Sequence, residues 1–155
     1  MIITTKNIKN QDIKRREVIY ATRWMSNLLM GKRLTDKLVI DYYFRDIDDS
    51  GTCFAIDADT YPRHFEIEIK SGLGRLDILS VIAHELVHVK QFARRELIQP
   101  GLKVAKYLGK EYQTEDLNYW DLPWEIEALG REIGLFTRYD EHLQTDPHLT
   151  LRLTR

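Results

Sequence analysis

Residues 76–92 form the most distinctive pattern in the chain, because apolar side chains would surround nearly the whole circumference of a helix built from them. Such a pattern predicts a helix that is mostly buried. A narrow polar stripe interrupts it at steps of three or four residues. The stripe consists of Asp77, Ser80, His84, His88, Gln91 and Arg95. Unpaired polar groups are costly to bury, so the stripe either contacts partners inside the fold or faces solvent.

Two other segments have the periodicity of amphipathic helices. Residues 11–30 are the first and residues 122–139 the second, with Asp121 as the expected N-cap and Pro123 in the first turn. The apolar stripe predicted for the second helix is Leu122, Ile126, Leu129, Ile133 and Phe136. The tail from residue 146 onward is expected to be ordered only if it docks on the rest of the protein.

Three segments between the helices are predicted β-strands, at residues 38–44, 53–58 and 64–70. The last alternates between apolar and polar residues, which predicts a half-buried strand with one polar face. Pro100-Gly101 is expected to end the central helical region, and a short hairpin around Leu108-Gly109 is the interpretation open for the segment that follows. The predicted fold class is α+β, with a small, mostly antiparallel sheet.

Length and composition predict a single domain over residues 1–155. The net charge of −1, with 30% charged residues, gives no support for nucleic-acid binding. Cys53 is the only cysteine, so no intramolecular disulfide can form. The polar first residues lack the apolar core of a signal peptide, and no apolar stretch approaches the ~20 residues that span a bilayer. We therefore expect a cytoplasmic protein without a membrane partner. The sequence does not predict its oligomeric state.

The sequence His84-Glu85-Leu86-Val87-His88 lies in the middle of the central helix. Residues four apart share one helix face, so the two imidazoles are placed to hold one Zn²⁺. Glu85 is not a ligand in this arrangement, but it can take the proton from a zinc-bound water as a general base. The pattern predicts a zinc-dependent hydrolase, and the competing interpretation is a chance match on an ordinary helix.

A zinc ion held by two histidines needs at least one more protein ligand. Cys53, His142 and His148 are the weaker candidates, because Cys53 lies in a strand far upstream and both histidines follow the last predicted helix. That helix itself offers two carboxylates, Glu125 and Glu127.

Helical phase distinguishes the two carboxylates. At 100° per residue, Glu125 falls about 50° from the centre of the predicted apolar stripe and Glu127 about 150° from it. We therefore expect Glu125 to face inward as the third ligand, and Glu127 to face solvent and pair with Arg131. Glu132, about 70° from the centre, is a candidate to support a ligand residue without binding the metal itself. An ordinary first-turn Glu favoured by the helix dipole is the alternative for Glu125, and the choice between Glu125 and Glu127 stays open.

The His84–His88 motif, followed downstream by Glu125-Ile126-Glu127-Ala128, resembles the zincin metallopeptidases, in the gluzincin branch with a glutamate ligand. The chain is also similar to small SprT-like metallopeptidases of phages and bacteria through Val87-His88-Val89-Lys90-Gln91, Tyr119-Trp120 and Pro123-Trp124. The resemblance implies a minimal zincin-like core with an N-terminal helix, a metal-binding helix and a C-terminal helix that carries the third ligand.

Carried over to this chain, the resemblance implies His84, His88 and Glu125 as zinc ligands and Glu85 as the catalytic base. Tyr107, Tyr112 and Tyr119 are candidates by residue type to stabilise the oxyanion, and Trp120 and Trp124 are interpreted as core residues or pocket walls. Two features depart from the pattern. SprT-like proteins place a third His soon after the pair, whereas the next one here is His142, and Leu129 stands where many gluzincins have an Asp that supports the first His.

The leading functional hypothesis is a zinc-dependent peptidase that hydrolyses protein or peptide substrates bound in an extended conformation. Residues 64–70 are expected to be the edge strand that pairs with the substrate backbone. The alternatives are a zincin-fold protein that keeps the metal but only binds a partner's segment, and a structural domain with an accidental motif.

Overall fold

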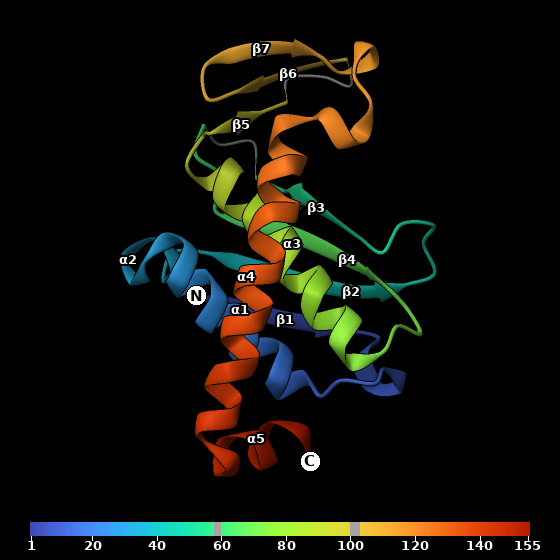
Figure 1. Ribbon diagram of the computed structural model, residues 1–155, viewed down its shortest axis with the longest axis vertical. Helices are drawn as coiled ribbons and strands as arrows, with labels where there is room; N and C mark the ends of the chain where they lie inside the picture. Colours follow the sequence, from blue (N-terminus) through green and yellow to red (C-terminus); the bar gives the residue numbers. More distant parts are fainter. Residues whose placement is uncertain (58–59, 100–102) are drawn as a thin grey trace.

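The computed structural model describes residues 1–57, 60–99 and 103–155, and its α+β architecture agrees with the predicted fold class (Figure 1). The helices are α1 (Arg15–Met30), α2 (Lys32–Thr35), α3 (Arg75–Ala93), α4 (Pro123–Thr145) and α5 (Pro147–Thr154). The strands are β1 (Ile2–Lys6), β2 (Val39–Arg45), β3 (Gly51–Ala55), β4 (His64–Lys70), β5 (Leu97–Ile98), β6 (Val104–Tyr107) and β7 (Lys110–Gln113). Short 3₁₀ helices are η1 (Ile8–Asn10), η2 (Thr114–Asp116) and η3 (Tyr119–Asp121).

The main sheet has the strand order β1-β2-β4-β3, and its pairing contradicts the predicted mostly antiparallel sheet. The pairs β1–β2 and β2–β4 are parallel, and β3 alone runs antiparallel, along β4. The prediction was wrong because the N-terminal segment was interpreted as polar, so the strand that it forms, β1, was not predicted. A strand there, followed by the crossover helix α1, places β1 parallel to β2.

The apolar face of this sheet is built from facing pairs on the two central strands. They are Ile40 and Phe65, Tyr42 and Ile67, and Phe44 and Ile69, all of them buried. Helices α1 and α3 pack on this face, and α4 lies across them as a further layer (Figure 1). The predicted alternation of residues 64–70 is confirmed, with the same bounds.

The expectation that residues 64–70 form an edge strand is wrong. Strand β4 pairs with β2 on one side and with β3 on the other, so its backbone groups are already used. The edges of the main sheet are β1 and β3. The period of two that identifies a strand does not say how many neighbours it has, which explains the error.

The predicted helices are present with shifted ends. Helix α1 ends at Met30 as predicted but begins at Arg15, and α3 ends at Ala93, before the expected stop at Pro100-Gly101, which lies outside the described residues. Helix α4 carries Pro123 in its first turn, but Leu122 rather than Asp121 is its N-cap. The tail does dock, as α5, with Leu153 buried in the core.

The apolar stripe predicted for α4 is wrong in its direction. Ile126 and Ile133 are 55% and 72% exposed. The buried apolar face is instead formed by Trp124, Ala128, Leu135, Tyr139 and Leu143. The helix is therefore rotated by roughly a third of a turn from the expected orientation, at 3.6 residues per turn. Glu125 lies between the two stripes and faces inward in both orientations.

A second, antiparallel sheet of order β5-β6-β7 lies beside the start of α4 (Figure 1). Its β6–β7 hairpin turns at Leu108 and Gly109, which both have positive φ, at 49° and 86°. This is the hairpin considered from the sequence, and two positive-φ residues are typical of a type I′ turn. The sheet packs on Trp124 through Leu97, Ala105 and Tyr107. No helix among residues 1–57, 60–99 and 103–155 is long and apolar enough to cross a membrane.

Candidate metal centre

Three predicted ligands come together between α3 and α4. His84 and His88 lie one turn apart on α3 with their Nε2 atoms 3.2 Å from each other. Glu125, in the first turn of α4, places Oε2 3.4 Å from the Nε2 atom of each histidine. One ligand atom from each residue lies within 4.8 Å of the other two. Two imidazole nitrogens and one carboxylate oxygen are a donor set typical of catalytic zinc.

The outer nitrogens of the two imidazoles are also held. His84 Nδ1 lies 3.1 Å from Oε2 of Glu132, whose Oε1 accepts a 2.5 Å hydrogen bond from the Ser80 hydroxyl. His88 Nδ1 lies 2.8 Å from the Gln91 side-chain oxygen. Both rings are thereby oriented with Nε2 toward Glu125, so the residues present fit a bound metal.

The charges around this cluster favour a cation. Burial alone would lower the pKa of His84, but the hydrogen bonds to Glu125 and Glu132 outweigh it and raise the pKa to about 10. The pKa of His88 is also raised, since contacts with Glu125 and Glu85 outweigh its burial. For Glu125, burial is outweighed by hydrogen bonds from both histidines and from Tyr119, so its pKa lies well below the usual range. A site that stabilises positive charge in this way suits a divalent metal ion.

Glu85 lies beside the cluster and is only 4% exposed. Burial raises its pKa to about 7, although the neighbouring His88 and His84 act in the opposite direction. A carboxylate with a pKa near neutrality is suited to accept and return a proton.

Gly51, at the start of β3, makes room for Glu85. A Cβ atom at this position would lie 2.4 Å from Val81 Cγ1 and 2.9 Å from Glu85 Oε1. Strand β3 therefore approaches α3 too closely for a side chain at residue 51. This close approach was not predicted from the sequence.

A cavity of about 810 Å³ opens over the cluster, between β3, α3, α4 and the segment before α4. Its lining includes His84, Glu85, His88 and Glu125, together with Trp120 and Trp124 as walls. Both tryptophans were predicted as core or pocket residues. Trp124 is buried and Trp120 is 65% exposed, so only the second presents most of its surface to solvent.

The three candidate tyrosines occupy different places. Tyr119 lines the cavity, and its hydroxyl donates a 2.7 Å hydrogen bond to Glu125 Oε2. Tyr107 donates instead to Glu127, and Tyr112 packs against Trp124 with ring centroids 6.0 Å apart. Of these three tyrosines, Tyr119 is therefore the one beside the cluster of candidate ligands. Burial and the Glu125 carboxylate raise the pKa of its hydroxyl, which stays protonated as a donor.

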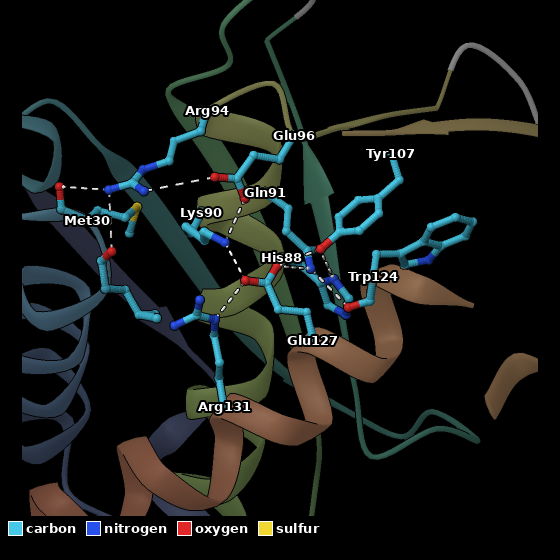
Figure 2. A network of polar contacts seen from close by, with 11 residues as sticks. Met30, His88, Lys90, Gln91, Arg94, Glu96, Tyr107, Trp124, Glu127 and Arg131 are labelled. Atoms are coloured by element: carbon cyan, nitrogen blue, oxygen red, sulfur yellow. Dashed lines mark hydrogen bonds and ion pairs between the residues drawn. The ribbon is translucent and has the colours of Figure 1, made fainter. Parts of the chain in front are cut away.

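Contrary to the prediction, Glu127 does not face solvent. It pairs with Arg131 at 2.7 Å as expected, but its side chain is only 17% exposed and contacts Lys90 at 2.5 Å (Figure 2). It also accepts hydrogen bonds of 3.0 Å from Gln91 and from Tyr107. The rotation of α4 explains the difference, because it turns Glu127 toward the C-terminal end of α3.

The weaker ligand candidates lie outside the cluster. Cys53 lines the cavity from β3, but burial raises the pKa of its thiol, whereas a thiol ligand must lose its proton. His142 lies elsewhere, 2.8 Å from the Tyr20 hydroxyl and stacked on Trp24. His148 lies in α5.

Comparison of the chain with protein-family models, curated proteins and solved structures finds no match. The functional argument therefore depends on the site itself, and the resemblance to zincins depends on the short motifs that carry it.

Proposed function

We propose that the protein is a zinc-dependent peptidase that hydrolyses peptide bonds in extended protein segments. The convergence of His84, His88 and Glu125, with Glu85 buried beside them, is the observation that carries the proposal. A structural helix pair has no need to aim three donor atoms at one point and to keep a fourth titratable group next to them.

His84, His88 and Glu125 would hold the ion. Bound zinc lowers the pKa of a water toward ~7 and polarises the scissile carbonyl. Glu85, with its pKa near 7, accepts a proton from the attacking water and delivers it to the leaving amine. Tyr119 presents its hydroxyl at the same cavity and is the candidate donor to the oxyanion.

Strand β3 supports an extended substrate. It is an edge of the main sheet, and Gly51, Thr52 and Cys53 line the cavity. The side of an edge strand that faces away from its neighbour offers backbone donors and acceptors to a second chain. We therefore assign to β3 the role that the sequence suggested for residues 64–70.

Incubation of the zinc-loaded protein with a heat-denatured, fluorescently labelled protein pool tests the proposal. Wild-type protein should release peptides, and Glu85→Gln should lower the rate by a factor on the order of 10² or more while it retains zinc. Glu111→Gln, an exposed change of the same kind on β7, should cleave like the wild type. A zinc-loaded wild type that cleaves no faster than Glu85→Gln would contradict the peptidase and favour the metal-binding module that does not hydrolyse.

A further inference from the structure

We infer that Gln91, held in place by Glu127, is a positioning residue that determines which nitrogen of His88 faces the metal. The inference rests on the proposed function for the presence of the ion. Its evidence is a chain of polar contacts that runs from His88 away from the cavity and ends in a group of charges between α3, α4 and β6 (Figure 2).

The orientation of the Gln91 amide follows from its neighbours. Its Nε2 atom donates to the Trp124 backbone carbonyl at 2.9 Å and to Glu127 Oε2 at 3.0 Å. Both partners are acceptors, so a flipped amide would place its oxygen against two oxygens. The amide oxygen must therefore point to the remaining partner, Nδ1 of His88, at 2.8 Å.

This orientation determines the tautomer of His88. An amide oxygen only accepts, so Nδ1 of the ring carries the hydrogen. In the neutral ring that binds a metal, the lone pair is then on Nε2. Nε2 is the atom that lies 3.4 Å from Glu125 and 3.2 Å from His84 Nε2, inside the cluster of donor atoms. Gln91 is itself fully buried, which removes water as a competing partner.

Glu127 is fixed from three elements at once. Lys90 on α3 contacts its Oε1, Arg131 on α4 contacts the same atom, and Tyr107 on β6 donates to its Oε2. Lys90 is buried and is paired on its other side with Glu96 at 2.6 Å. Glu127 therefore has little freedom to move away from Gln91, and the docking of the second sheet contributes to the position of a metal ligand.

The two ligating histidines are supported by different chemistry. His84 donates directly to a carboxylate, that of Glu132. His88 donates to the neutral amide of Gln91, which in turn contacts the carboxylate of Glu127. A carboxylate increases the basicity of the ring, and an amide chiefly orients it. The function of Gln91 is therefore positioning, and a substitution there should affect the selection of the nitrogen.

Gln91→Leu tests the inference, because it keeps the side-chain volume and removes both polar atoms. Its zinc affinity, measured by competition with a chromophoric chelator, should fall by about ten- to a hundredfold. Gln144→Leu is the matched control, since Gln144 is exposed and bonds only Asp140 among the contacts described. Its affinity should equal that of the wild type.

Two further measurements distinguish positioning from a general loss of structure. Nitrogen-15 NMR of the zinc-loaded wild type should show His88 ligating through Nε2 with Nδ1 protonated. The double variant Gln91→Glu/Glu127→Gln restores an acceptor to His88 and a donor beside it, so it should recover affinity that Gln91→Leu loses. Gln91→Glu alone places two carboxylates together and should not recover it.

Each outcome decides the question. A folded Gln91→Leu that binds zinc like the wild type, or a wild type that ligates through Nδ1 of His88, would overturn the inference and leave the peptidase proposal intact. If Gln91→Leu does not fold, the His88 nitrogen pattern of the wild type decides. Wild-type protein that binds no zinc would remove the proposed function and this inference together.

Discussion

Glu125 and Glu132 lie two helical turns apart on α4 and contact opposite nitrogens of one imidazole, that of His84. Glu125 Oε2 is 3.4 Å from Nε2, and Glu132 Oε2 is 3.1 Å from Nδ1. A spacing of seven residues returns a helix to the same face. Helix α4 thus supplies both the third candidate ligand, Glu125, and the carboxylate that supports the first candidate ligand, His84. Glu132 provides this support, which the apolar side chain of Leu129 cannot.

Substitution of Glu132 should weaken metal binding without removing a ligand. Glu132→Ala leaves His84 Nδ1 without its carboxylate, and zinc affinity should fall by about 10- to 100-fold. Glu132→Gln keeps an acceptor but loses the charge, so its loss should be smaller. Chelator competition at neutral pH gives both values. Equal affinity in wild type and Glu132→Ala would show that the carboxylate does not act on the metal site.

Glu125→Ala and Glu127→Ala should differ in kind. Glu125→Ala leaves two candidate ligands, so zinc binding should no longer be stoichiometric in elemental analysis. Glu127→Ala leaves buried Lys90 with Glu96 alone and should lower the free energy of unfolding by about 1–3 kcal/mol. Glu127→Ala should lower zinc affinity only indirectly, because Gln91 loses a partner that holds its amide. Urea unfolding of the metal-free variants separates the two effects. A loss of stoichiometric zinc in Glu127→Ala but not in Glu125→Ala would reverse the ligand assignment.

The sequence was sufficient for the elements whose pattern is dominated by burial. The all-round apolar segment that became α3 and the alternating strand β4 lie where predicted. Glu125 was also placed correctly, although the stripe used to place it was wrong. At 100° per residue, it lies about 50° from the centre of the predicted stripe and at a similar angle from the centre of the observed one.

The errors have a common physical cause, since each concerns a neighbour that a single segment does not specify. Ile126 and Ile133 look like core residues in the pattern, yet they are exposed. Glu127 pairs with its helical neighbour as expected, but its main partner, Lys90, comes from another helix. Tertiary contacts of this kind, like the parallel pairing of β1 with β2, have no periodic signature.

Gly51→Ala should displace Glu85, the proposed catalytic base. The added methyl group would lie 2.4 Å from Val81 Cγ1 and 2.9 Å from Glu85 Oε1, and overpacking of this kind costs about 1–3 kcal/mol. Thermal unfolding should show lower stability, and peptide release should fall because Glu85 is displaced. In Gly51→Ala/Val81→Ala the closer contact is relieved, so stability should partly return while activity stays low. Full recovery of activity in the double variant would show that Glu85 is not displaced.

Glu127 should make the stability of the protein depend on pH in the acidic range. Burial would raise its pKa, but contacts with Lys90, Gln91, Arg131 and Tyr107 outweigh it and lower the pKa from 4.5 to about 2. The folded state therefore holds the ionised form more strongly than the unfolded chain does. The resulting stabilisation is complete above pH 4.5, and it is lost as the pH falls toward 2.

Urea unfolding of metal-free wild type and Glu127→Gln between pH 7 and pH 3 measures this contribution. The wild type should be the more stable protein at pH 7, and its advantage should shrink steadily below pH 4.5, because the unfolded wild-type chain then gains a proton that the amide of the variant never binds. Glu111→Gln, on the exposed surface of β7, should differ from the wild type by a small and nearly constant amount over the same range. A wild-type advantage over Glu127→Gln that grows on acidification would mean that the contacts of Glu127 do not stabilise its charged form.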